Sequence, residues 1–160
     1  MVNALLREEN IFAGLDASDY KEALEKLVGF LPDWALTSGE RKKIFQRLLM
    51  REQLGTTAVG GGTAFPHCFS TEVSEPLVAF GVSSDGIDYP SLDGRAVHFI
   101  FVLILPQTES AELQKRQILQ SIKWFLCDRY LQERLRGAKS ASEIFHLLVP
   151  DAQRHVALGV

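Results

Sequence analysis

The chain reads VGGGTAFPHC over residues 59–68, the most unusual stretch of its 160 residues. Three consecutive glycines lose much backbone freedom on folding, so a folded structure must need them there. They suit a turn with positive φ angles, or a backbone that a ligand approaches so closely that its N–H groups bind an anion. The stretch is not a P-loop, because no Gly-Lys-Ser/Thr follows it.

His67 follows a proline at the end of this stretch. Pro66 has a fixed φ angle and biases the residue before it toward an extended backbone, so we expect His67 at a rigid strand end. An imidazole held there can be a nucleophile toward phosphorus, a general base or a metal ligand. Cys68 adds the alternatives of a thiol hydrolase or a metal centre. We expect no metal, because no second Cys/His pair has ligand spacing, and a hydrolase lacks an orienting partner.

Strand patterns continue outward from this centre. Residues 56–68 suit brief strands around a tight turn. Two nearly continuous apolar runs, at residues 77–82 and 96–105, predict strands that are buried on both faces. Residues 83–95 between them contain Asp-Gly twice and a proline, which predicts a loop or a hairpin excursion. Residues 10–12 are short and apolar and predict an edge strand.

Helical patterns occur in the sequence both before and after these strands. A capping box at Thr37 to Glu40 opens a helix that ends at Gly55, with Arg51 in its last turn, and a second box at Ser140 to Glu143 opens another. The remaining apolar spacing predicts further helices, which lie at residues 20–31, 113–126 and 128–136. Helices that flank a cluster of strands indicate a layered α/β domain. We predict one domain over residues 1–150 and a C-terminal tail over residues 151–160.

Composition excludes several classes of protein. The formal net charge is −3 and no Lys/Arg-rich block occurs, so we expect no nucleic-acid partner. Two cysteines are too few for a disulfide framework and indicate a reducing compartment. The first twelve residues lack the pattern of a signal peptide, and the longest apolar run is about half of the ~20 residues that span a bilayer. We therefore expect a cytoplasmic protein without direct membrane insertion.

The longer segment REQLGTTAVGGGTAFPH, residues 51–67, carries a family resemblance. It resembles the phosphorylation-site segment of the fructose/mannitol-type (type 2) enzyme IIA family of the phosphoenolpyruvate-dependent phosphotransferase system, which includes nitrogen-regulatory members. The resemblance extends from Leu-x-x-x-Asn-Ile-Phe at residues 6–12 to the Ser-x-x-Glu-Ile helix start at residues 140–144. It implies a mixed central sheet of about five strands sandwiched by helices on both faces, with the active histidine on the sheet edge.

The resemblance also implies a chemistry that needs no cofactor. His67 would accept a phosphoryl group from a histidine phosphocarrier protein and pass it to a downstream IIB domain, or hold it as a signal for a regulated protein. Arg51 matches the family's active-site arginine and offers a planar donor pair to phosphate oxygens. Without the resemblance, Arg51 would be a solvated cation at a helix C-terminus. Backbone N–H groups of Gly60, Gly61 and Gly62 would also contact the phosphate.

The chain departs from the family at one position. Many members carry a second histidine near the start of the helix after the long strand, and that position falls on Lys115 here. A lysine supplies a positive point charge rather than an oriented imidazole. This departure, together with the lack of an attached permease domain in the chain, favours regulation over sugar transport. The alternative is a regulatory binding module of the same fold that controls a partner without phosphoryl transfer.

Three further polar residues are expected to be structural. We expect His98 to be a packed, hydrogen-bonded residue of the central strand. Glu52 and Asp128 are expected to be solvated charges on helix surfaces.

Overall fold

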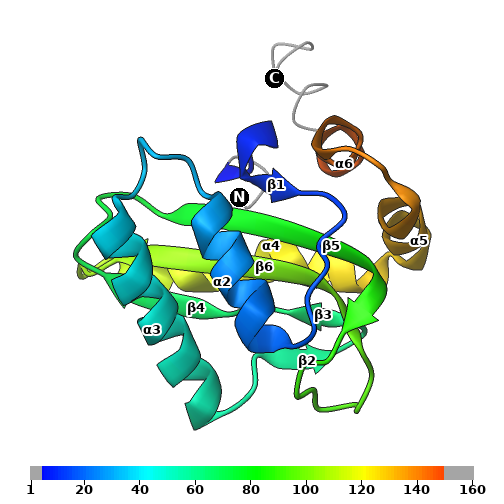
Figure 1. The fold of residues 1–160 in the computed structure, drawn as a ribbon, viewed down its shortest axis with the longest axis horizontal. Coiled ribbons are helices and arrows are strands. Elements are labelled where there is room, and N and C mark those ends of the chain that lie inside the picture. The colour runs from blue at the N-terminus through cyan, green and yellow to red at the C-terminus, as the bar shows by residue number, and fades with distance from the viewer. Residues whose placement is uncertain (1–4, 150–160) are drawn as a thin grey trace.

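The computed structural model describes residues 5–149, and in them a mixed sheet lies between two layers of helices (Figure 1). Six strands form the sheet in the order β1-β5-β6-β3-β2, and β4 also pairs with β6. The predicted α/β class and the sandwiched sheet are confirmed, with one strand more than the expected number of about five. The predicted boundary at residue 150 and the tail over residues 151–160 lie outside the described residues.

The strands are short at the sheet edges and long at its centre. In chain order they are β1 (Ile11–Phe12), β2 (Ala58–Gly60), β3 (Thr63–Ala64), β4 (His67–Ser70), β5 (Leu77–Ile87) and β6 (Val97–Pro106). Strand β6 is antiparallel to β5 on one side and parallel to β3 and β4 on the other. Strand β1 is parallel to β5, and β2 closes a hairpin with β3. The predicted edge strand near residue 11 is therefore confirmed.

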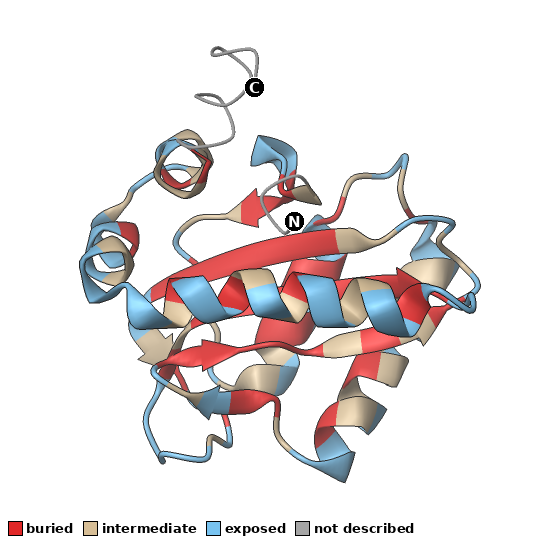
Figure 2. Ribbon diagram, turned by 180° about the vertical axis from the view of Figure 1, so that it is seen from behind, coloured by how far each residue is buried: buried red, intermediate tan, exposed pale blue. Residues whose placement is uncertain are grey.

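Helices cover both faces of the sheet. They are α2 (Tyr20–Phe30), α3 (Ser38–Leu54), α4 (Ala111–Cys127), α5 (Arg129–Gly137) and α6 (Ala141–Leu148), with a short 3-10 helix η1 (Glu8–Asn10) before β1. Helices α2 and α3 cover one face, while α4, α5 and α6 lie on the side seen from behind (Figure 1, Figure 2). In the described part of the chain, no helix is long and apolar enough to cross a membrane.

Strand β6 separates two hydrophobic cores. Successive side chains of a strand point to opposite faces, so its residues alternate between the cores. Ile100, Val102 and Ile104 pack toward α2 and α3. Phe99, Phe101, Leu103 and Leu105 pack toward α4. Figure 2 shows the result: the central strands are buried, and α4 turns buried residues to the sheet and exposed residues outward.

Strand β5 is longer than the sequence indicated. The expectation that residues 83–95 leave the sheet is wrong for their first part, because β5 continues to Ile87. The register shifts between Val82 and Ile87, and the Gly86 N–H donates to the Ser83 hydroxyl at 3.0 Å. Asp85-Gly86 therefore belongs to an irregularity within the strand, where glycine at positive φ is as useful as in a turn.

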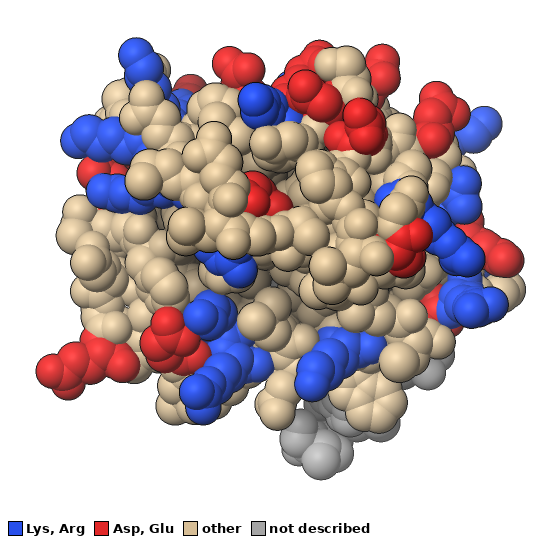
Figure 3. Space-filling view, turned by 90° about the horizontal axis from the view of Figure 1, so that it is seen from below, with Lys and Arg blue, Asp and Glu red and all other residues tan. Residues whose placement is uncertain are grey.

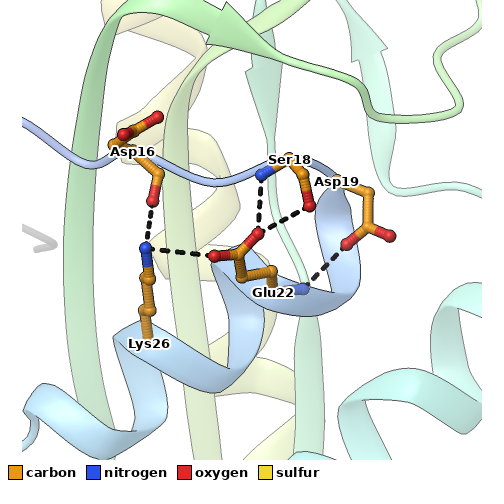
Figure 4. A network of polar contacts seen from close by, with 5 residues as sticks. All are labelled: Asp16, Ser18, Asp19, Glu22 and Lys26. Atoms are coloured by element: carbon orange, nitrogen blue, oxygen red, sulfur yellow. Dashed lines mark hydrogen bonds and ion pairs between the residues drawn. The ribbon is translucent and has the colours of Figure 1, made fainter.

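Side-chain caps fix the starts of α2, α3, α5 and α6. At α2 the Asp19 carboxylate accepts from the Glu22 N–H at 2.9 Å, and Glu22 accepts from the Ser18 N–H and hydroxyl at 2.7 and 2.6 Å (Figure 4). Lys26 adds an ion pair with Glu22 at 3.2 Å and contacts the Asp16 carbonyl oxygen. These contacts satisfy N–H groups that a helix start leaves without a partner.

The predicted capping box of α3 is confirmed. The Thr37 hydroxyl accepts from the Glu40 N–H at 3.2 Å, and the Glu40 carboxylate accepts from the Thr37 N–H at 2.8 Å. In the second predicted box, Ser140 accepts from the Glu143 N–H at 3.1 Å, but the Glu143 carboxylate accepts from the N–H of Lys139, one residue before the cap. The α3 box matters for function because the last turn of this helix carries Arg51.

We predict that Thr37→Ala lowers the free energy of unfolding by about 1 kcal/mol, because the Glu40 N–H at the start of α3 loses the hydroxyl that accepts from it. Urea unfolding followed by circular dichroism measures this change. Ser110→Ala is the matched control, since Ser110 precedes α4 without a side-chain capping bond. Equal destabilisation by the two substitutions would contradict the prediction.

Candidate active site

His67 is the first residue of β4, on an edge of the sheet. Strands β3 and β4 occupy successive stretches of the same side of β6, separated by residues 65–66. Within the described sheet, β4 pairs with β6 alone. Pro66 cannot donate a ladder hydrogen bond, but its carbonyl oxygen accepts from the Leu103 N–H at 2.9 Å. The expectation of a histidine on the sheet edge is therefore confirmed.

The His67 ring is oriented by its own backbone. Its Nδ1 lies 2.9 Å from the carbonyl oxygen of Phe65. A carbonyl oxygen only accepts hydrogen bonds, so Nδ1 carries the proton in the neutral ring and the lone pair of Nε2 is free. A neutral imidazole with a free nitrogen is the nucleophilic form of histidine.

Burial and nearby charges keep this imidazole neutral. Burial lowers the pKa of His67 most, and the positive charges of Arg51 and Lys115 lower it further. The hydrogen bond to the Phe65 carbonyl and the negative charge of Glu52 act in the opposite direction, and the net direction of the pKa shift is downward. His67 therefore keeps its lone pair at neutral pH and below the ordinary histidine pKa.

Arg51 reaches the site from the last turn of α3. Its Nη1 donates to the Gly55 carbonyl oxygen at 2.8 Å, at the C-terminal end of the helix. One guanidinium group has five N–H donors in a planar fork, so this anchor leaves donors for an anion. The structure thus brings Arg51 within electrostatic range of His67.

Lys115 reaches the site from the first half of α4. Its Nζ lies 2.8 Å from the Glu112 carboxylate and 5.4 Å from the centroid of the Phe69 ring, two residues beyond His67 on β4. Successive odd residues of a strand share a face, so Phe69 and His67 lie on the α4 side of the sheet. Lys115 is thus a positive charge near His67, at the position where the resemblance placed the family's second histidine.

The three glycines lie elsewhere. Thr63 pairs with Phe99 and His67 with Leu103, so four residues of extended chain, about 13 Å, separate the glycine turn from His67. Gly60, Gly61 and Gly62 all have positive φ and form the β2–β3 turn. The N–H of Gly61 donates to the Asp93 carboxylate at 3.0 Å. The expectation that these glycines contact a phosphate on His67 is therefore wrong, and they form a turn at a distance from it.

Glu52 is buried, contrary to the expectation of a surface charge. Its carboxylate accepts from the Thr57 N–H at 3.1 Å and from the Thr57 hydroxyl. These bonds hold the end of α3 against the start of β2, and the negative charge also acts on His67. In the sequence, the one feature that relates to this burial is the threonine at position 57, five residues after Glu52. Asp128, by contrast, is exposed and caps α5 through the Leu131 N–H at 2.9 Å.

The other candidate residues have structural surroundings. His98 is half-buried in β6 and its Nδ1 lies 2.8 Å from the Ser83 carbonyl oxygen, which confirms a hydrogen-bonded strand residue. Cys68 points to the opposite core from His67, and burial raises the pKa of its thiol to about 12. A protonated thiol is a poor nucleophile, so a Cys68–His67 hydrolase is disfavoured. Within residues 5–149, no group of His, Cys, Asp and Glu side chains could hold a metal ion.

Several exposed apolar residues lie close in sequence to the two cations of the site. Leu54 follows Arg51 on α3 and is 87% exposed, and Leu113 precedes Lys115 on α4 and is 59% exposed. Met50 is exposed beside Arg51. Figure 3 shows the underside of the molecule, where basic groups gather at both sides and along the lower part of the view, and acidic groups line its upper rim. Such a surface suits contact with another protein.

We predict that Arg51→Gln raises the pKa of His67 toward its ordinary value of 6.5, because one of the positive charges that lower it is removed. Titration of the ring protons by nuclear magnetic resonance measures this shift. Lys42→Gln, an exposed change in the first half of α3, serves as the control and leaves the pKa unchanged. Identical His67 titration curves for Arg51→Gln and wild type would contradict the electrostatic role of Arg51.

Comparison with known proteins agrees with this geometry. The family model described as "Phosphoenolpyruvate-dependent sugar phosphotransferase system, EIIA 2" matches residues 4–149. A nitrogen regulatory protein of Bradyrhizobium diazoefficiens is 32% identical over 147 residues, which cover 92% of this chain and 94% of that protein.

Two solved structures share the fold. The nitrogen regulatory protein IIA-Ntr of Neisseria meningitidis has a TM-score of 0.80 at 24% identity and covers 92% of this chain and 98% of its own. Enzyme IIAMTL, solved in complex with phosphorylated enzyme IIBMTL from Escherichia coli, has a TM-score of 0.73 at 24% identity, with 91% and 97% covered. The family match over all described residues, together with the fold, shows that the chain belongs to the type 2 enzyme IIA family of phosphoenolpyruvate-dependent sugar phosphotransferase systems.

Proposed function

We propose that the protein carries a phosphoryl group on Nε2 of His67, taken from a histidine phosphocarrier protein. One observation carries this proposal: Nδ1 is held by the Phe65 carbonyl oxygen while burial and two cations keep the ring neutral. The ring therefore presents a single nucleophilic nitrogen at the sheet edge. Family membership supports the same chemistry, since the matched family is a phosphotransferase component.

The transfer exchanges one nitrogen–phosphorus bond for another. The Nε2 lone pair attacks the phosphorus of the donor's phosphohistidine, and the donor's nitrogen–phosphorus bond breaks with its electron pair returning to the donor imidazole. The Nδ1–H bond to the Phe65 carbonyl can persist throughout. Such a reaction needs positioning and charge stabilisation more than covalent help, and Arg51 and Lys115 supply positive charge beside the phosphoryl oxygens.

An exposed apolar side chain beside Arg51 supports a protein as the phosphoryl donor and as the acceptor. Leu54 lies three residues after Arg51 on α3, on the same side of the helix, and is exposed to a partner. A IIB domain is one class of acceptor, by analogy with the IIAMTL–IIBMTL complex. The same face would have to serve donor and acceptor in turn, because one nitrogen receives and releases the group.

We further propose that the phosphorylation state of His67 is used as a regulatory signal. The relative from Bradyrhizobium diazoefficiens is named a nitrogen regulatory protein and matches over nearly its whole length. Lys115 in place of a second histidine is consistent with holding a phosphoryl group rather than relaying it rapidly, since an ammonium group provides charge without an oriented imidazole. The second candidate function is a binding module that controls a partner without transfer.

We predict that wild-type protein gains one acid-labile phosphoryl group when incubated with phosphoenolpyruvate, the first enzyme of the system and its histidine carrier, and that His67→Ala gains none. Intact-mass spectrometry before and after acid treatment measures the change. Cys68→Ser keeps the phosphorylation, because the buried thiol takes no part. Arg51→Gln slows it on the order of 10²-fold, the usual effect of losing one charge-stabilising donor. No mass gain by wild type with an active carrier would refute the phosphocarrier function.

We predict that the phosphorylation state changes which proteins the chain binds. His67→Asp places a negative charge at the site, and affinity capture from the source cell's lysate compares its partners with those of wild type. A regulatory switch gives different partner sets for the two forms. His146→Gln, an exposed substitution on α6, is the control and captures the wild-type set. Identical sets for all three proteins would support the binding module that acts without phosphorylation.

A further inference from the structure

A second basic site lies at the β3 end of the β3–β4 edge, beside the glycine turn. A pocket of about 490 Å³ opens between the β2–β3 turn, the start of β6 and helix α5. Its volume falls in the range of roughly 300–1,000 Å³ that is usual for small-molecule sites. The residues that define it are Gly61, Gly62, Arg95, His98, Arg129 and Arg136.

The charged groups of this pocket are mostly cationic. Three arginines line it and Glu133 is the one acidic residue among the lining side chains of the described chain, although the protein as a whole has a net charge of −3. None of the ion pairs found among residues 5–149 involves these arginines. Arg136 has one weak bond, to the Ser84 carbonyl oxygen at 3.4 Å. Most of the guanidinium N–H donors are thus available to a ligand.

The arginines converge on the pocket from different elements. Arg129 and Arg136 are seven residues apart on α5, which is two helical turns, so both lie on the same side of this helix. Arg95 comes from the loop before β6. Planar guanidinium groups from two sides match the oxygens of a phosphate group, which accept paired N–H bonds.

Fixed groups form the rest of the wall. Gly61 and Gly62 line the pocket without side chains, at φ angles of 67° and 74°, and their backbone is held by bonds to Asp93 and to the start of β6. The His98 ring beside Gly62 is tied to the Ser83 carbonyl oxygen. The side-chain nitrogen of Gln132, which also lines the pocket, donates to the Phe125 carbonyl oxygen at 3.0 Å. Walls that are ordered before binding reduce the entropy cost of taking up a ligand.

We infer that this pocket binds a small phosphorylated metabolite with at least two negative charges, at a site separate from His67. The cations supply the charge complementarity, and the volume exceeds what a single inorganic phosphate fills. The site does not depend on phosphoryl transfer at His67, because the glycine turn lies about 13 Å along the sheet edge from that residue.

Titration of the ¹⁵N-labelled full chain with inorganic pyrophosphate, at an ionic strength of about 0.15 M, tests this inference. We expect saturable shifts of the amide signals of Gly61, Gly62 and Phe99. Arg129→Gln and Arg136→Gln each weaken binding about tenfold, since each removes one charge-assisted contact. Arg134→Gln is the matched control on the same helix, because Arg134 lies against the Tyr130 ring outside this pocket, and it leaves the affinity unchanged.

A second arm separates this pocket from the candidate active site, whose cations could also attract pyrophosphate. Arg51→Gln keeps the shifts at Gly61 and Gly62 if the inference is right. Shifts confined to Thr57 and His67 that vanish in Arg51→Gln would overturn it, as would the absence of saturable shifts in wild type. The four substituted residues, Arg51, Arg129, Arg134 and Arg136, are exposed or partly exposed, so we expect the variants to fold. Thermal unfolding followed by circular dichroism checks this.

Discussion

The paired ladder on β6 is the constraint on which the rest of the structure depends. This strand bonds to β5 along one side and to β3 and β4 in succession along the other. Its side chains alternate between the two cores, so its register sets the position of every layer. The site depends on the same register: a slip of one residue in β4 would turn His67 toward α2 and α3 and bring Cys68 to the α4 side.

Local signals in the sequence predicted much of this architecture. The capping box at Thr37, the long apolar run of β6 and the stop at Gly55 all act through neighbours in the chain, and all three are found. Strands β2 and β3 are too short to give a period-two pattern, and they are held by pairing to each other and to β6. The residues at Asp85-Gly86 carry a turn signal that also suits an irregularity inside a strand, so only the partner strand decides between the two.

The positions of His67 at the start of an edge strand and of Arg51 in the last turn of a helix follow from the sequence, while their roles in phosphoryl transfer stay predictions. The glycines were placed with His67 because they are near it in sequence, but an extended chain carries sequence neighbours far apart in space. The burial of Glu52 depends on Thr57 and on Tyr89, which lie outside its helix. The helical pattern of α3 therefore cannot predict that burial. Burial of a charge is a property of the assembled layers rather than of the helix that carries it.

The bond from His67 to the Phe65 carbonyl has a consequence for how such a protein can diversify. The acceptor that fixes the proton on Nδ1 is the main-chain carbonyl oxygen of residue 65. Any residue type that keeps the backbone geometry at this position supplies the same acceptor. Side chains on α3 and α4 around the histidine are then free to change without altering which atom reacts. Surface substitutions on these helices can therefore change what the protein contacts while the same ring nitrogen stays free.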